Sequence, residues 1–153
     1  MRPTVTEQLD GVCRILEDVI APEIAGSHPR ETLRNLVSNL RMLSRSWTRL
    51  LPFLHWDNAA STALLLAARE QAGAPLATRI DTIVASAPAD LADAEAVHAY
   101  NTVLRACLSE CILARCDAVL TEHMAEHFAD RAARYPLRLT GAQPQRPAAG
   151  GGA

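Results

Sequence analysis

The sequence contains no lysine, and all fifteen of its basic residues are arginine. Aromatic residues make up only 4% of the chain, and seventeen acidic residues leave a net charge of −2. Binding to nucleic acid relies on a clear excess of positive charge, so this balance predicts no nucleic-acid partner. An arginine-only basic set with abundant alanine is also typical of GC-rich coding, and arginine content alone therefore says little about function.

Long apolar runs and paired cysteine motifs are missing as well. No stretch approaches about eighteen uncharged apolar residues, and no basic leader followed by an apolar run opens the chain. We therefore expect a cytoplasmic protein without a membrane partner. The cysteines lack the CxxC spacing of zinc sites, so we expect buried, reduced and inert thiols, with no metal or other cofactor. They are Cys13, Cys107, Cys111 and Cys116.

Apolar residues recur at helical spacing along most of the chain, and no alternation typical of strands is present. Thr4 and Glu7 have the spacing of a capping box at the start of the first helix. In the last helical segment the apolar stripe drifts after Arg115, which predicts a bend or a change of packing partner there. The expected helices cover residues 5–21, 29–50, 58–72 and 76–85, and a long segment from Asp90 or Asp93 to Arg134.

Pro52 predicts a break between the second and third helices. A proline disfavours helical geometry at the residue before it, so we expect the second helix to end near Leu50. The four residues from Phe53 to Trp56 would then form a short apolar connection, and Asp57 would be the N-cap of the third helix.

The predicted fold class is all-α, an antiparallel bundle of four to five helices joined by short connections. Residues 1–136 are expected to form one helical bundle domain. Residues 137–153 are rich in glycine and proline and are predicted to be a disordered tail.

One expected helix carries a row of arginines opposite a continuous apolar face. The spacing of four and seven residues places them within roughly a 100° arc, where guanidinium groups suit carboxylates or phosphates. We predict that this row binds a protein partner or an anionic ligand. The alternative is that acidic residues of the first helix, Glu7, Asp10, Glu17 and Asp18, pair with it inside the fold. The row consists of Arg30, Arg34, Arg41, Arg45 and Arg49.

The expected turn between the second and third helices combines aromatic and polar residues. Trp47, His55, Trp56 and Asp57 would line a pocket there, or the aromatic rings would seal one end of the bundle. His55 and Asp57 are close enough in sequence for a hydrogen-bonded pair. No serine or cysteine nucleophile is linked to them by a motif, so no catalytic residue is assigned.

His123 and His127 stand four residues apart, a spacing that lets two imidazoles of one helix hold a metal ion. Glu122 and Glu126 are adjacent, but neither stands three residues before a histidine as in di-iron bundles. Two histidines do not complete a metal site. The alternative is a solvated helix face near a carboxyl end.

Three stretches resemble a small bacterial helical family of unknown function. They are the run from Gln8 to Asp18 with Pro22-Glu23, the run from Asn35 to Leu40, and the run from Phe128 to Pro136. Genes of that family neighbour aminoglycoside-phosphotransferase-like kinases and acyl-CoA dehydrogenases, so the resemblance implies an accessory subunit without catalytic residues. The chain departs from the family at its closing element, where Tyr135 precedes Pro136 instead of following it.

These features together predict a non-enzymatic helical interaction or accessory protein. Its partner would be a second copy of the chain, in a homo-oligomer, or a kinase-like or acyl-CoA dehydrogenase-like protein. The alternative is a bundle enzyme or a protein that binds a small ligand or metal, with a pocket near His55 and Asp57 or near His123 and His127.

Overall fold

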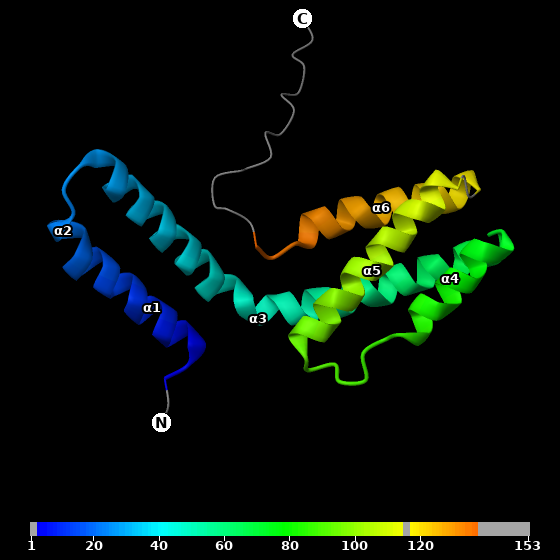
Figure 1. The fold of residues 1–153 in the computed structure, drawn as a ribbon, viewed down its shortest axis with the longest axis horizontal. Helices are drawn as coiled ribbons and strands as arrows, with labels where there is room; N and C mark the ends of the chain where they lie inside the picture. The colour runs from blue at the N-terminus through cyan, green and yellow to red at the C-terminus, as the bar shows by residue number, and fades with distance from the viewer. Residues whose placement is uncertain (1–2, 115–116, 138–153) are drawn as a thin grey trace, which may run out of the picture. The chain divides into compact units, whose positions relative to one another are not determined.

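A computed structural model describes residues 3–114 and 117–137, and every regular element in those ranges is helical (Figure 1). The all-α bundle class predicted from the sequence is therefore confirmed. The predicted disordered tail, apart from Leu137, lies outside the described residues, as do Arg115 and Cys116. The helices are α1 Val5–Ile15, η1 Leu16–Ile20, α2 Ala21–Glu23, α3 Ser27–Arg69, α4 Ala74–Ala85, α5 Ala94–Leu113 and α6 Ala118–Arg134.

The chain divides into two compact units. The first, here called the hairpin unit, comprises the described residues up to Trp47, and it contains α1, η1, α2 and the first part of α3. The second, the core unit, comprises Thr48–Pro136 with the rest of α3 and the helices α4, α5 and α6. The single domain over residues 1–136 remains a prediction.

The hairpin unit is a pair of antiparallel helical segments. Three side-chain contacts join them in opposite order along the chain: Trp47 Nε1 donates to Thr6 Oγ1 at 3.0 Å, Ser44 Oγ donates to Asp10 Oδ1 at 3.0 Å, and an Arg41 nitrogen lies 2.6 Å from Glu17 Oε2. Among its described apolar side chains, Cys13 and Val37 are the buried ones, at 2% and 3% exposure. The interior of this unit is therefore very small.

Local signals set the ends of the first segment. The Thr4 hydroxyl accepts from the Glu7 backbone at 3.2 Å, and the Glu7 carboxylate accepts from the Thr4 backbone at 2.7 Å, so the predicted capping box is confirmed. The segment stays helical to Glu23, through the single π-helical turn η1. Gly26, with a φ of 93°, then reverses the chain in a conformation that favours glycine.

The predicted break at Pro52 is wrong, because α3 continues through it from Ser27 to Arg69. A proline inside a helix removes one backbone hydrogen bond and crowds the preceding turn, at a cost of about 3 kcal/mol. The residues that follow it, Phe53 and Leu54, are both buried in the core unit. Their burial offsets that cost, since each large apolar side chain contributes about 1.5–3 kcal/mol.

The core unit has two apolar clusters, a large one with side chains from α3, α4, α5 and α6 and a small one formed by Phe53, Leu54 and Val97. Pro75 lies in the first turn of α4, and the Asp93 and Asp117 carboxylates cap α5 and α6. The long last segment, for which a bend or a change of packing partner was predicted after Arg115, is two helices, α5 and α6, which end and begin on either side of residues 115–116. The predicted burial of Cys107 and Cys111 is confirmed. The fully buried apolar side chains of the core unit include Leu65, Ile80, Leu104, Cys107, Leu108, Cys111 and Met124.

Candidate functional site

A buried polar network joins three helices of the core unit. Asp57, on α3, is fully buried. Its Oδ2 accepts from Arg131 Nε and from Asn101 Nδ2, both at 2.7 Å, and its Oδ1 lies 3.0 Å from His127 Nε2. Asp57 is therefore not the N-cap that the sequence predicted: it lies inside α3 and pairs with side chains of α5 and α6.

Asn58 and Asn101 extend this network. Asn101 Nδ2 also donates to Asn58 Oδ1 at 2.8 Å, and Asn58 Nδ2 donates to the Val97 carbonyl at 3.1 Å. Because a buried carboxylate is costly unless it is paired and hydrogen-bonded, these contacts fix one arrangement of α3, α5 and α6.

The network contains Ser, His and Asp, but not in the order of a hydrolytic triad. Ser61 Oγ lies 3.2 Å from His127 Nε2, the same nitrogen that faces Asp57. In a triad the serine and the carboxylate contact opposite nitrogens of the imidazole, and the serine faces the substrate. Ser61 is fully buried, so this geometry indicates a structural network.

Aromatic rings cover one side of the network. The Arg134 guanidinium lies 4.4 Å from the centroid of the Trp56 ring, and Trp56 lies 5.4 Å from the His127 ring. Phe53 and Tyr135 meet edge to face at 5.4 Å. Trp56 thus packs against the network and is absent from the lining of the neighbouring cavity.

The core unit also has an open cavity of about 510 Å³. It lies between α3, α4, α5 and the connection from α4 to α5. Of the four predicted pocket residues, His55 lines it, Asp57 and Trp56 belong to the network, and Trp47 lies in the hairpin unit. The lining residues are His55, Asn58, Ala59, Thr62, Val84, Ala87, Pro88, Leu91, Val97 and Tyr100.

His55 and Asp57 do not lie in an irregular turn, where their spacing would allow a hydrogen-bonded pair. Both residues lie inside α3, where two positions are separated by about 200° around the axis. His55 consequently lines the cavity while Asp57 contacts Arg131 and Asn101.

The two histidines of α6 lie in different surroundings. His127 is buried against Asp57 and Ser61, whereas His123 is exposed. Among the residues that the structure describes, no group of three or more histidine, cysteine, aspartate or glutamate side chains is placed to hold a metal ion. The structure therefore does not bring His123 and His127 together as one site.

The arginine row is used partly inside the hairpin unit. Arg30 Nε donates to the Ile24 carbonyl at 2.9 Å, and Arg41 pairs with Glu17. The second contact is of the kind that the alternative interpretation predicted. Arg49 belongs to the core unit, so the row extends over both units. A role of Arg34 and Arg45 in binding a partner or an anion remains a prediction.

Sequence reasoning missed an exposed apolar face on the hairpin unit. At about 100° per residue, its members lie on the side of each helix away from Glu17 and Arg41. Ile15 and Val19 are 57% and 59% exposed, and Leu36 is 48% exposed. The sequence signal that could have revealed this face is the width of the apolar stripe on both helices. We call this the apolar face; it consists of Val5, Val12, Ile15, Val19, Leu36, Leu43 and Trp47.

No family model, curated protein or solved structure matches this chain. The resemblance to a bacterial family near kinases and acyl-CoA dehydrogenases therefore remains a prediction. Within the described ranges, no helix combines the length and the apolar character needed to cross a membrane.

Proposed function

We propose that this protein is a non-enzymatic interaction protein and that the apolar face of its hairpin unit binds a second copy of the chain. The proposal rests on the large apolar side chains that the hairpin unit leaves exposed, because Cys13 and Val37 are the only buried ones among its described apolar side chains. Contiguous exposed apolar surface of this kind marks interaction sites.

The hairpin unit lacks the buried surface that a stable two-helix fold needs. Helices of this length gain most of their stability from packing, and very small units need oligomerisation or another constraint. Burying one exposed valine or leucine contributes about 1.5–3 kcal/mol. A partner that covers the apolar face would supply this missing burial.

The charge distribution favours a second copy as the partner. Arg41 and Glu17 pair on the other side of the hairpin, so two apolar faces can meet without bringing these charges together. Two antiparallel hairpins packed face to face form a four-helix bundle, and a two-fold axis makes the same patch serve both chains.

Gly11 gives independent support. It lies inside α1, where glycine costs about 1 kcal/mol relative to alanine, and, apart from its own stretch of helix, no atom lies within 4 Å of the position that its Cβ would take. A shallow hollow of about 370 Å³ lies over it, lined by Arg14, Ile15, Asp18 and Val19. Nothing in the described hairpin requires a glycine there, whereas a helix of a second copy would approach closely at this point.

A pair of charge substitutions on α3 tests the proposal. Leu36 and Ser38 are both exposed and two residues apart, but only Leu36 belongs to the apolar face. We expect sedimentation equilibrium to show a dimer for the wild type and for Ser38→Glu, and a monomer for Leu36→Glu. A wild type that stays monomeric at its highest soluble concentration would overturn the proposal, as would an unchanged dimer of Leu36→Glu.

Gly11→Ala sharpens this test. Alanine should stabilise α1 within one chain, because it favours the helix and meets no neighbouring atom. The same methyl group should weaken the dimer if a second helix packs at Gly11. An alanine variant that dimerises more tightly than the wild type would place the interface elsewhere.

A different partner is implied by the family resemblance, namely a kinase-like or acyl-CoA dehydrogenase-like protein. The arginine row, with Arg34 and Arg45 on its exposed side, would then contribute to recognition. Co-purification from the native host with wild type and with Arg34→Glu/Arg45→Glu tests this alternative. We expect such a partner to be lost from the double variant, while the dimer through the apolar face is retained.

A further inference from the structure

We propose that the cavity of the core unit binds a small, largely apolar molecule that carries one hydrogen-bonding group. This proposal is independent of the hairpin unit and of its self-association. Its volume of about 510 Å³ lies within the range of about 300–1,000 Å³ that is typical of small-molecule sites.

The lining determines the class of ligand. Alanine, valine, leucine and proline side chains form most of the wall, and His55 contributes an imidazole to it. Among the described residues, no arginine, aspartate or glutamate lines the cavity. Since burying a charge without a partner is costly, a nucleotide, a phosphorylated sugar or a charged peptide does not fit, and an uncharged apolar molecule does.

A few polar groups remain to orient such a ligand. The amide of Asn58 is already committed, because its nitrogen donates to Val97 and its oxygen accepts from Asn101. The other hydrogen-bonding side chains of the lining are His55, Thr62 and Tyr100. One hydroxyl or carbonyl group on the ligand is enough to pair with the His55 imidazole.

The buried polar network makes this cavity rigid on one side. Asn58 and Val97 line the cavity and are also joined to each other, and Asn101 links Asn58 to Asp57. A preformed wall reduces the entropy that binding costs. Leu91 of the connection between α4 and α5 also lines the cavity and is 59% exposed, so a bound apolar molecule would cover it.

Small lining residues allow a matched test with tryptophan. Ala59 lines the cavity, whereas Ala63 lies one turn later on α3 and does not; both are exposed. We would titrate the full chain with 2-naphthol and follow backbone amide signals by NMR. We expect saturable shifts at Ala59 and Val97, a loss of affinity of about tenfold or more for Ala59→Trp, and an unchanged affinity for Ala63→Trp.

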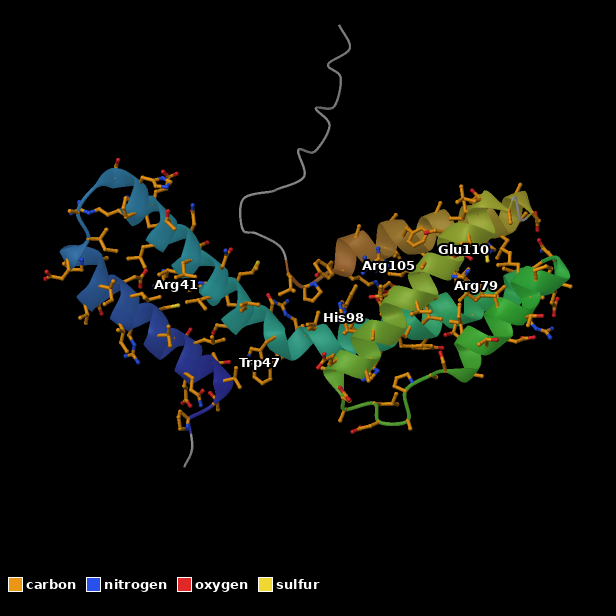
Figure 2. The ribbon with its side chains drawn as sticks, in the orientation of Figure 1. Arg41, Trp47, Arg79, His98, Arg105 and Glu110 are labelled. Carbon is orange, nitrogen blue, oxygen red and sulfur yellow. The ribbon has the colours of Figure 1, made fainter. Side chains whose placement is uncertain are left out.

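The polar end of the site is tested with a second probe. Naphthalene has the same ring system as 2-naphthol but no hydroxyl group. His55→Phe should weaken 2-naphthol several-fold and leave naphthalene unchanged, while His98→Phe, at an exposed position of α5 (Figure 2), should change neither. An equal loss of both probes in His55→Phe would overturn the orienting role of His55.

Two outcomes would overturn the binding site itself. One is the absence of saturable shifts at the lining residues, and the other is an equal effect of Ala59→Trp and Ala63→Trp. The monomeric variant Leu36→Glu should bind 2-naphthol as the wild type does, because its substitution lies in the hairpin unit. Binding that is lost in this variant would assign the probe to the apolar face and contradict the proposal.

Discussion

The two units of this chain contain helices of similar character but differ in what they bury. In the core unit, side chains from four helices form a continuous interior, and Asp57 ties three of them together through a buried network. In the hairpin unit, the described residues include two buried apolar side chains, Cys13 and Val37, and eight large exposed ones. The difference shows that an amphipathic pattern predicts a helix but does not say whether the chain itself covers the apolar side.

This contrast has energetic consequences. Stability is not uniform within a protein, and segments with few buried apolar contacts open more readily than a packed core. The core unit should therefore be stable at any protein concentration. The stability of the hairpin unit should depend on binding a second copy, because a partner that binds only the folded form stabilises that form by mass action.

The largest expected effect comes from breaking the buried network. Asp57→Ala leaves the Arg131 guanidinium without its carboxylate and should lower the free energy of unfolding by about 3–5 kcal/mol. Chemical denaturation would measure it. Asp81→Ala is the control. The ion pair of Asp81 with Arg69 is exposed, so its loss should change the free energy of unfolding little. Equal effects of the two substitutions would contradict a structural network in the core unit.

Leucine truncation compares the two units directly. Leu108→Ala removes a fully buried side chain of the core unit and should cost about 2–5 kcal/mol at every protein concentration. Leu36→Ala should change the stability of the monomer by no more than about 0.5 kcal/mol. The loss of stability caused by Leu36→Ala should rise with protein concentration, because the dimer forms. A cost for Leu36→Ala that does not vary with concentration would contradict the difference between the units.

Cysteine labelling compares the same units by a local probe. Burial raises the pKa of the Cys107 thiol, so little reactive thiolate forms in the folded core unit. Cys13 is also buried, but in the hairpin unit, which should open more often. At low protein concentration we expect Cys13 to react faster with a thiol reagent than Cys107, as measured by mass spectrometry of the labelled peptides. Faster labelling of Cys107 would reverse this order.

The smallest effects concern pH. Hydrogen bonds from the Thr4 backbone and hydroxyl lower the pKa of Glu7 below its ordinary value of 4.5, and a hydrogen bond from Arg69 lowers the pKa of Asp81 below 3.8. A carboxyl group with a lowered pKa in the folded state stabilises it above the unfolded pKa. This contribution is lost as the pH falls through the folded value.

We therefore expect the first turn of α1 to fray as Glu7 becomes protonated at pH values below 4.5, with a small effect because the carboxylate is exposed. NMR titration of the carboxyl carbons gives both pKa values, and Glu7→Gln should remove the pH dependence at α1. A Glu7 pKa at or above its ordinary value would show that the capping box does not form in solution.

Features set by neighbouring residues could be predicted from the sequence. The Thr4 and Glu7 capping box, the proline in the first turn of α4 and the Asp93 cap of α5 each depend on side chains within a few positions of the backbone that they hold. Helical periodicity likewise predicted the all-α class, because it does not depend on which face is later covered.

Features set by distant residues could not be predicted from the sequence. Pro52 predicts a helix break, and only the burial of Phe53 and Leu54 in the core unit shows why α3 continues. The local sequence predicts Asp57 to be a helix cap. Its actual partners, Asn101 and Arg131, follow 44 and 74 positions later, too far along the chain for a local pattern to indicate them. The cavity lining comes from α3, α4, α5 and the connection between α4 and α5, which are distant in sequence, and His55 is the one member of the predicted pocket that lines it.

On the proposal made above, the hairpin unit needs a second copy and the core unit does not. Backbone hydrogen exchange at several protein concentrations tests this difference, with the amides of α1 compared with those of α5. We predict that protection of α1 rises with concentration in the wild type and not in Leu36→Glu, while protection of α5 stays constant in both. Protection of α1 that equals that of α5 and does not vary with concentration would contradict this claim.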